Sequence, residues 1–158
     1  QPFEYQILKN KMKISYLKKD STNRPSLKAD WRLYQLIIFN IVQNAVKYNK
    51  RGGTISITTE LKEDEESQSL NQMVFETTIT DDGKGIKKER LPYLFKVFGE
   101  LKHNLEIQND QDIKDNGIGV GLSCSKIIAN ALGGDVNFVP NELEKTMLSV
   151  TLKVKTYE

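Results

Sequence analysis

The chain has 158 residues, a length that suits one compact domain. Its 23 Lys and Arg residues against 21 Asp and Glu residues leave a formal charge of +2, so no strong field would attract nucleic acid. The single Cys and single His exclude an internal disulfide and metal sites built on Cys clusters or His pairs, and without an export signal or an apolar membrane span they favour a cytoplasmic domain.

Hydrophobic periodicity predicts one unit that mixes helices and strands. Helices are expected over residues 3–11, 30–48 and 121–132, and strands over residues 12–17, 25–29, 54–61, 73–81, 135–139 and 146–155. Asp30 is a good N-cap for the long helix. The apolar stripe of that helix is expected to contain Leu33, Leu36, Ile37 and Ile41. The polar segment 62–72 is predicted to be a solvated loop between two strands.

Two asparagines one turn apart mark the long helix. Asn40 and Asn44 border its apolar stripe, and Lys47 and Tyr48 follow one turn later. Asparagine is a poor residue for a helix interior because its amide competes for backbone hydrogen bonds. Contacts with neighbouring backbone would explain the pair, and so would a pocket lined by amide oxygens, an ammonium group and an aromatic ring.

An aspartate ends the strand over 73–81. Alternation places Phe75, Ile79 and Asp81 on one face, so a core-facing strand would carry an inward carboxylate that must be hydrogen-bonded. Gly83 and Gly85 then allow a sharp turn or a close approach to a flat ligand. A simple Asp-Gly turn is the alternative interpretation.

Three closely spaced glycines precede the helix over 121–132. Gly117, Gly119 and Gly121 would expose backbone N–H groups where the helix dipole favours an anion. The pattern has neither the GxxxxGK[ST] form of a P-loop nor the preceding strand of a Rossmann fingerprint. The polar segment 102–116 before it is predicted to be a mobile flap.

In this order the three features resemble the GHKL ATPase superfamily, and most closely the catalytic and ATP-binding domain of sensor histidine kinases. The resemblance runs from about Met12 to Lys155. The matching segments are residues 40–48 for the N box, 81–85 for the G1 box, 94–98 for the F box and 117–121 for the G2 box. It implies that residues 1–158 are one α+β domain, a two-layer α/β sandwich of the Bergerat type, with a mixed sheet packed against helices and a mobile ATP lid over about 86–120.

The resemblance assigns one set of residues to the phosphates. Asn44 would hold a Mg²⁺ ion that bridges them, Asn40 would assist, and Lys47 would contact phosphate, so these three carry the implied catalytic role. The closing lid would wrap the phosphates with Gly117, Ile118, Gly119, Val120, Gly121 and Leu122. The arginine usual after the second F-box aromatic is missing, and Lys102 is its candidate replacement.

A second set would hold the base. Tyr48 would stack near the adenine, and Asp81 would accept a hydrogen bond from its amino group, which excludes guanine. Thr146, which opens the last strand and faces inward by alternation, would support Asp81 through water. Further ATP contacts are implied for Gly83, Gly85, Ile86 and Phe98.

Three further positions depart from the family pattern. Asp82 and Lys84 stand where Asn and Pro are usual, and Lys145 stands where a glycine usually precedes the threonine of the last strand. The first two are spacer positions, so nucleotide binding is expected to be little affected. The conformation of the turn at Lys145 stays open.

Asn40 also separates the subfamilies. Hydrolytic members usually have a Glu there that activates water, and Asn cannot take up a proton, which favours phosphoryl transfer to a protein. The resemblance implies a histidine acceptor on a separate dimerisation domain and a response-regulator receiver domain as the next acceptor. His103 falls in the lid and is not expected to be that acceptor. A serine kinase, an ATP hydrolase and a nucleotide-binding pseudokinase are the alternatives.

The expected partners belong to a longer protein. The chain begins at Gln1 without an initiator methionine, so we expect it to be a piece of that protein. The acceptor domain would lie elsewhere in the parent chain, and a membrane-anchored, homodimeric parent stays open.

Overall fold

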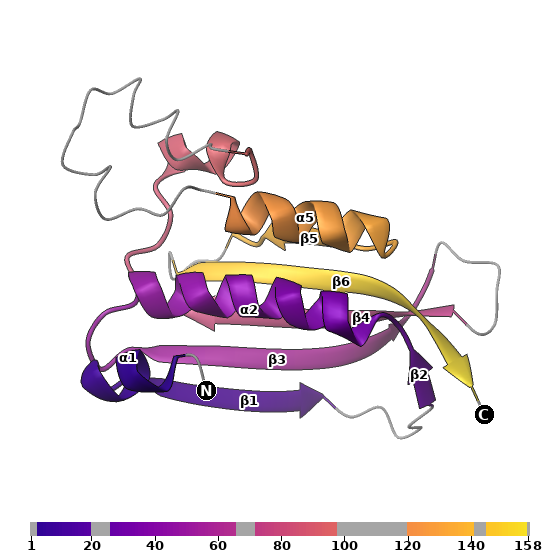
Figure 1. Ribbon diagram of the computed structural model, residues 1–158, viewed down its shortest axis with the longest axis horizontal. Coiled ribbons are helices and arrows are strands. Elements are labelled where there is room, and N and C mark those ends of the chain that lie inside the picture. The colour runs from indigo at the N-terminus through magenta and orange to yellow at the C-terminus, as the bar shows by residue number, and fades with distance from the viewer. Residues whose placement is uncertain (1–2, 20–25, 66–71, 98–119, 141–144, 158) are drawn as a thin grey trace.

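The computed structural model describes residues 3–19, 26–65, 72–97, 120–140 and 145–157 (Figure 1). Its helices are α1 (Glu4–Lys9), α2 (Trp31–Tyr48) and α5 (Gly121–Ala131), with a 3-10 helix η1 (Lys88–Tyr93). Its strands are β1 (Lys13–Lys19), β2 (Ser26–Lys28), β3 (Thr54–Glu63), β4 (Gln72–Asp81), β5 (Asp135–Phe138) and β6 (Thr146–Tyr157).

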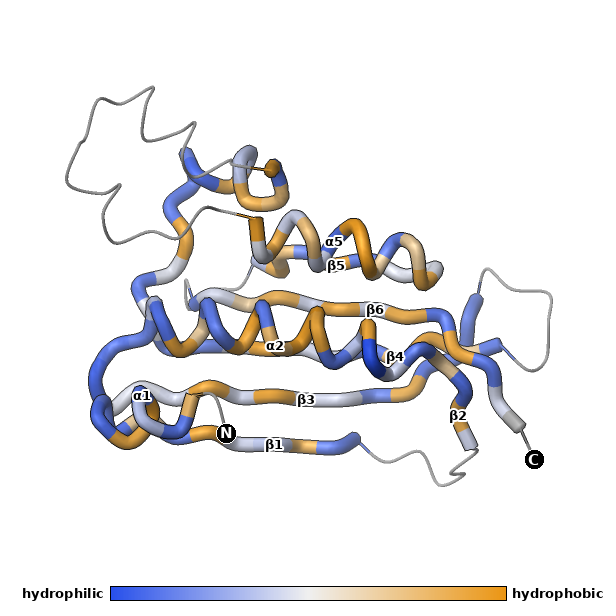
Figure 2. Tube along the Cα trace, viewed as in Figure 1, coloured by the Kyte–Doolittle hydropathy of each residue, from blue (hydrophilic) through white to orange (hydrophobic). Residues whose placement is uncertain are grey.

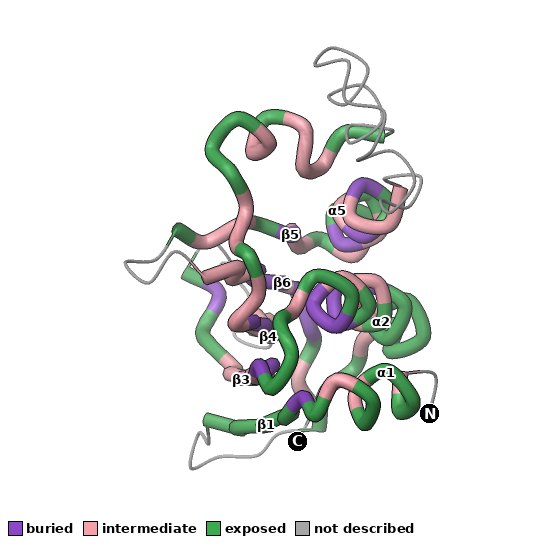
Figure 3. Tube along the Cα trace, turned by 90° about the vertical axis from the view of Figure 1, so that its left-hand side faces the viewer, coloured by how far each residue is buried: buried purple, intermediate pink, exposed green. Residues whose placement is uncertain are grey.

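The strands form one mixed sheet in the order β1-β3-β4-β6-β2, with β5 also paired to β6. Strand β1 pairs parallel with β3, and the other pairings are antiparallel. The helices lie in a second layer on one face of the sheet, and the buried parts of α2 and α5 face the strands (Figure 3). The predicted α+β sandwich is therefore confirmed. None of the described helices has the length and apolar character needed to cross a membrane.

The core lies between α2, α5 and the middle of the sheet, where hydrophobic residues recur along both helices and β6 (Figure 2). Helix α2 begins at its predicted N-cap, because the Asp30 carboxylate accepts hydrogen bonds from the N–H groups of Arg32 and Leu33 at 3.2 and 3.1 Å. The helix buries Ile37, Ile41, Val42, Ala45 and Val46.

The predicted stripe of α2 is half wrong. Ile37 and Ile41 are buried, but Leu33 and Leu36 are 36% and 45% exposed. Each residue advances an α-helix by about 100°, so Leu36 points far from Ile37 although it precedes it directly. Val42, Ala45 and Val46 are buried instead, so the buried stripe is centred on the side of Ile37 that faces away from Leu36.

The strands β3 and β4 run into the segment predicted to be a loop. Lys62 forms an ion pair with Glu76 on the neighbouring strand, and Ser149 Oγ donates to the same carboxylate at 2.7 Å. These cross-strand contacts stabilise the pairing of β3 with β4. The segment lacks the apolar alternation by which a strand is predicted from sequence. The helix η1 was not predicted from the sequence, since a six-residue 3-10 helix with Pro92 inside it is too short to show a helical period.

Candidate functional site

The polar edge of α2 faces the start of α5. The Asn40 amide nitrogen donates to the Gly121 carbonyl oxygen at 3.4 Å and to Ser125 Oγ at 3.2 Å. Ser125 is fully buried, and its hydroxyl donates to the same carbonyl at 2.9 Å. Both amide hydrogens of Asn40 are thereby engaged, and among the described residues its side-chain oxygen has no hydrogen-bond partner.

One turn further along, Asn44 is half-buried. Within the described part of the chain, its side chain makes no hydrogen bond. Lys47 and Tyr48 are exposed, and the Lys47 ammonium lies 5.0 Å from the centre of the Tyr48 ring. The last turns of α2 thus present an amide, a cation and an aromatic ring that the core does not use.

Asp81 lies at the end of β4, between β3 and β6. Its register partners are Ile55 and Thr146, and it is 5% exposed, which confirms that its strand carries an inward acid. The Gly83 N–H donates to Asp81 Oδ1 at 2.8 Å, and Thr146, the partner of Asp81 on β6, contributes a side chain that lowers the pKa of the carboxyl. The strand register thus places Thr146 beside Asp81, and support of Asp81 by Thr146 through water stays a prediction.

Burial controls the protonation of Asp81. Loss of solvation raises the pKa of its carboxyl above the ordinary value, the bonds from Gly83 and Thr146 oppose this rise, and the neighbouring Asp82 charge adds to it. Such a carboxylate has few solvent contacts to lose and can accept a hydrogen bond from a ligand.

The glycines after β4 are required by the geometry. A Cβ on Gly83 would lie 2.5 Å from Asp81 Oδ1 and 2.6 Å from the Tyr48 carbonyl oxygen, so only glycine fits between them. Gly85 has φ of +70°, in the left-handed region that glycine adopts without strain. Ile86 follows it and is half-buried. The turn after β4 therefore packs against the C-terminal end of α2.

The predicted lid is described only at its two ends. Phe95 packs against the core cluster, and the Lys126 ammonium lies 4.8 Å from its ring centre. At the other end, Val120, Gly121 and Leu122 open α5. Five predicted site residues lie outside the described residues: Phe98, Lys102, Gly117, Ile118 and Gly119.

Helix α2 thus contacts both the turn after Asp81 and the described end of the glycine-rich segment. Asn40 contacts the start of α5, and the Tyr48 backbone contacts the turn after Asp81, roughly 12 Å further along the helix at 1.5 Å per residue. Sequence reasoning missed Ser125 and Lys126. A serine on the buried side of a short helix was the available signal for Ser125.

The amide oxygens on α2 suit a hard cation that also keeps water or phosphate ligands. In the described ranges, no group of three or more His, Cys, Asp or Glu side chains could hold a metal ion. Mg²⁺ is typically held by one or two protein oxygens together with water and substrate phosphates. The amide oxygens of Asn40 and Asn44 on adjacent turns fit that pattern.

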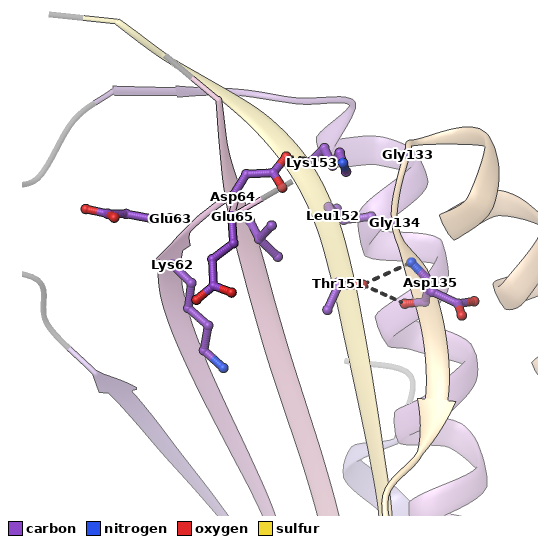
Figure 4. Close-up of a pocket in the computed structure, with 11 residues that line it drawn as sticks. Lys62, Glu63, Asp64, Glu65, Gly133, Gly134, Asp135, Thr151, Leu152 and Lys153 are labelled. Carbon is purple, nitrogen blue, oxygen red and sulfur yellow. Dashed lines mark hydrogen bonds and ion pairs between the residues drawn. The ribbon is translucent and has the colours of Figure 1, made fainter. Parts of the chain in front are cut away.

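A hollow of about 670 Å³ lies elsewhere, at the opposite end of β3 and β4 from Asp81 (Figure 4). Asp64 in its wall forms an ion pair with Lys153 at 3.2 Å, and the Asp135 N–H donates to Thr151 Oγ1 at 3.0 Å. None of the predicted site residues lines this hollow.

Residues 29–156 match the family model described as histidine kinase-, DNA gyrase B-, and HSP90-like ATPase. An uncharacterized sensor-like histidine kinase of Rhizobium meliloti is 32% identical over 126 residues, which are 80% of this chain and 21% of that protein. The sensor protein CutS of Streptomyces coelicolor is 30% identical over 123 residues, 77% of this chain and 26% of that protein. The chain thus spans about a fifth to a quarter of the length of these relatives.

Solved structures support the fold. The nucleotide-free catalytic domain of the histidine kinase ThkA aligns with a TM-score of 0.66 at 20% identity, over 96% of this chain and 84% of that one. Full-length ShkA in complex with AMPPNP aligns with a TM-score of 0.69 at 18% identity, over 99% of this chain and 28% of that one.

Proposed function

The chain belongs to the family of histidine kinase-, DNA gyrase B- and HSP90-like ATPases, and on this premise we propose that it binds ATP with Mg²⁺ and transfers the γ-phosphoryl group to a histidine. The acceptor histidine lies on a separate dimerisation domain of the parent protein, and a response-regulator receiver domain takes the phosphoryl group next. The homology to sensor histidine kinases supports this choice within the family.

One observation carries the nucleotide preference: the inward carboxylate of Asp81. It is held by the Gly83 N–H and the Thr146 side chain, and it has acceptor capacity to spare. Adenine offers an amino group to such an acceptor. Guanine carries a carbonyl oxygen at the corresponding position. That oxygen and the carboxylate are both acceptors, so no hydrogen bond could form between them. Tyr48, beside the same turn, supplies an aromatic ring for the base.

The middle and last turns of α2 suit the phosphates. Asn44 and Asn40 would hold Mg²⁺ through their amide oxygens, and the ion would supply charge neutralisation at the phosphates. Lys47 adds a positive charge, and backbone N–H groups of the glycine-rich segment that ends at Gly121 add hydrogen-bond donors. Catalysis then rests on positioning and charge neutralisation.

The described contacts of Asn40 favour transfer to a protein over hydrolysis. Its amide N–H groups are committed to Gly121 and Ser125, and an amide cannot act as a general base. Helix α2 contains no Asp or Glu that could replace it in activating water. A steady hydrolase would need such a group.

Nucleotide titration tests the binding proposal. We expect the chain to bind ATP and ADP, to bind ATP more tightly with Mg²⁺ than without it, and to bind GTP at least about tenfold more weakly, since a site that pairs with a polar group rejects ligands lacking it. Calorimetric titrations with each nucleotide, with Mg²⁺ and with EDTA, measure this. Equal affinity for GTP and ATP would contradict the role of Asp81.

Phosphoryl transfer needs its own test. We expect incubation with Mg²⁺, labelled ATP and the purified dimerisation domain of the parent protein to label that domain with acid-labile phosphate, because phosphohistidine hydrolyses in acid. Replacing the acceptor histidine by Ala should abolish the label. Nucleotide binding without any label would favour a pseudokinase, and acid-stable label would favour a serine kinase.

A further inference from the structure

An ion pair joins the two strand ends that flank Asp81. Lys145, just before β6, places its Nζ 2.5 Å from Oδ1 of Asp82, just after β4. Their side chains are 39% and 22% exposed, so both are partly shielded from solvent. These are two of the positions where the chain departs from the pattern it resembles, and the structure shows that the departures contact each other.

Asp82 is also tied to the strand on the other side. The Thr54 N–H donates to Asp82 Oδ2 at 3.1 Å, and the Asp82 N–H donates to the Thr54 carbonyl oxygen at the same distance. Asp82 therefore links the beginnings of β3 and β6 through its two carboxylate oxygens. Asp81, the preceding residue, pairs with Ile55 and Thr146, the next residues of those strands.

We propose that Lys145 and Asp82 form a clamp that positions the Asp81 carboxylate for the base of the nucleotide. The clamp fixes the backbone after β4, from which the Gly83 N–H reaches Asp81, and it holds the start of β6, from which Thr146 reaches the same carboxylate. Lys145 and Asp82 are positioning residues and do not contact the ligand. The inference rests on the proposed adenine site.

The ion pair also sets the local charge. Burial is the main cause that raises the pKa of Asp81, and the Asp82 carboxylate adds to the rise through like-charge repulsion, while Lys145 lowers the pKa of Asp82 through their hydrogen bond. Lys145, with a smaller contribution from Lys50, therefore offsets the negative charge of Asp82 beside the base-binding carboxylate.

A double-mutant cycle tests the clamp. The variants are Lys145→Met, Asp82→Asn and the double variant, with Lys145→Arg to restore the pair and Lys84→Met as a control that removes an exposed charge from the same turn. Dissociation constants are measured for ATP and for inorganic triphosphate, which has no base. Amide hydrogen exchange at Gly83 is measured in each variant without ligand.

We expect each single variant to bind ATP about three- to fivefold more weakly, the range set by a partly exposed ion pair near 1 kcal/mol. The double variant should lose no more than either single one, and Lys145→Arg should bind like the wild type. Asp82→Asn decides the matter, because removing a negative charge favours polyanions, so weaker ATP binding with undiminished triphosphate binding can come only from lost positioning.

Three results would overturn the clamp. The first is unchanged or tighter ATP binding by Asp82→Asn, and the second is a loss of affinity in the double variant equal to the product of the two single losses. The third is a loss of triphosphate affinity as large as the loss of ATP affinity. If the wild type binds ATP no better than GTP, the proposed adenine site itself fails. Exchange at Gly83 then decides, since faster exchange in Asp82→Asn supports the clamp and unchanged exchange overturns it.

Discussion

Asp81→Asn is expected to weaken ATP binding by about tenfold to a hundredfold while leaving the domain folded. A hydrogen bond to a charged group contributes about 1.5–3 kcal/mol, and the amide replaces that charged acceptor with a neutral group that can also present its N–H side to the base. Asn can still accept the Gly83 N–H and fills nearly the same volume, so β4 and β6 keep their register. Calorimetric titration with ATP measures the loss.

The same variant should be as stable as the wild type or more stable. The folded-state pKa of Asp81 is raised, so the buried charge costs stability above that pKa, and the cost disappears as the pH falls through it. Asn carries no charge to bury. The melting temperature at neutral pH should therefore equal or exceed that of the wild type, and a large drop would show that the carboxylate serves the fold.

Glu76→Gln is the matched control, because it removes a carboxylate on β4 that contacts Lys62 and Ser149 away from the site. ATP affinity should not change in that variant. In the wild type, ATP affinity should fall as the pH drops through the raised pKa of Asp81, and this dependence should vanish in Asp81→Asn. Equal ATP affinity of Asp81→Asn and wild type would remove Asp81 from the site.

The inward direction of Asp81 and Thr146 could be predicted because side chains on a strand have only two directions. Fixing Ile79 and Leu148 in the core fixes both polar residues on the same face, and their pairing follows from the register. A helix offers no such binary choice. Leu36 was misplaced because the centre of a helical stripe depends on which neighbours cover it, and α5 lies far along the chain.

The supporting contacts could not be predicted because they join distant segments. Asn40 and Ser125 are 85 residues apart in the sequence, and neither residue alone indicates the other. Lys145 and Asp82 meet only because β4 and β6 are neighbours with ends in register. From the sequence alone, the conformation of the turn at Lys145 stayed open and Asp82 was interpreted as a spacer. Only the sheet topology reveals their ion pair.

Asn44→Ala is expected to weaken Mg²⁺-dependent ATP binding by at least about tenfold and to reduce phosphoryl transfer by about a hundredfold or more, because lost metal contacts and lost charge stabilisation have effects of this size. ATP binding in EDTA should change little, since Asn44 then holds no ion. The fold should tolerate the change, because the Asn44 side chain makes no hydrogen bond within the described residues and Ala is the best helix former.

Gln43→Ala is the matched control, one residue earlier on the exposed face of α2. It should leave affinity unchanged both with Mg²⁺ and with EDTA. An equal loss in both conditions for Asn44→Ala would mean that the amide contacts the nucleotide directly. No loss in either condition would transfer the metal role to Asn40, whose amide nitrogen is already fixed by Gly121 and Ser125 with its oxygen left to coordinate.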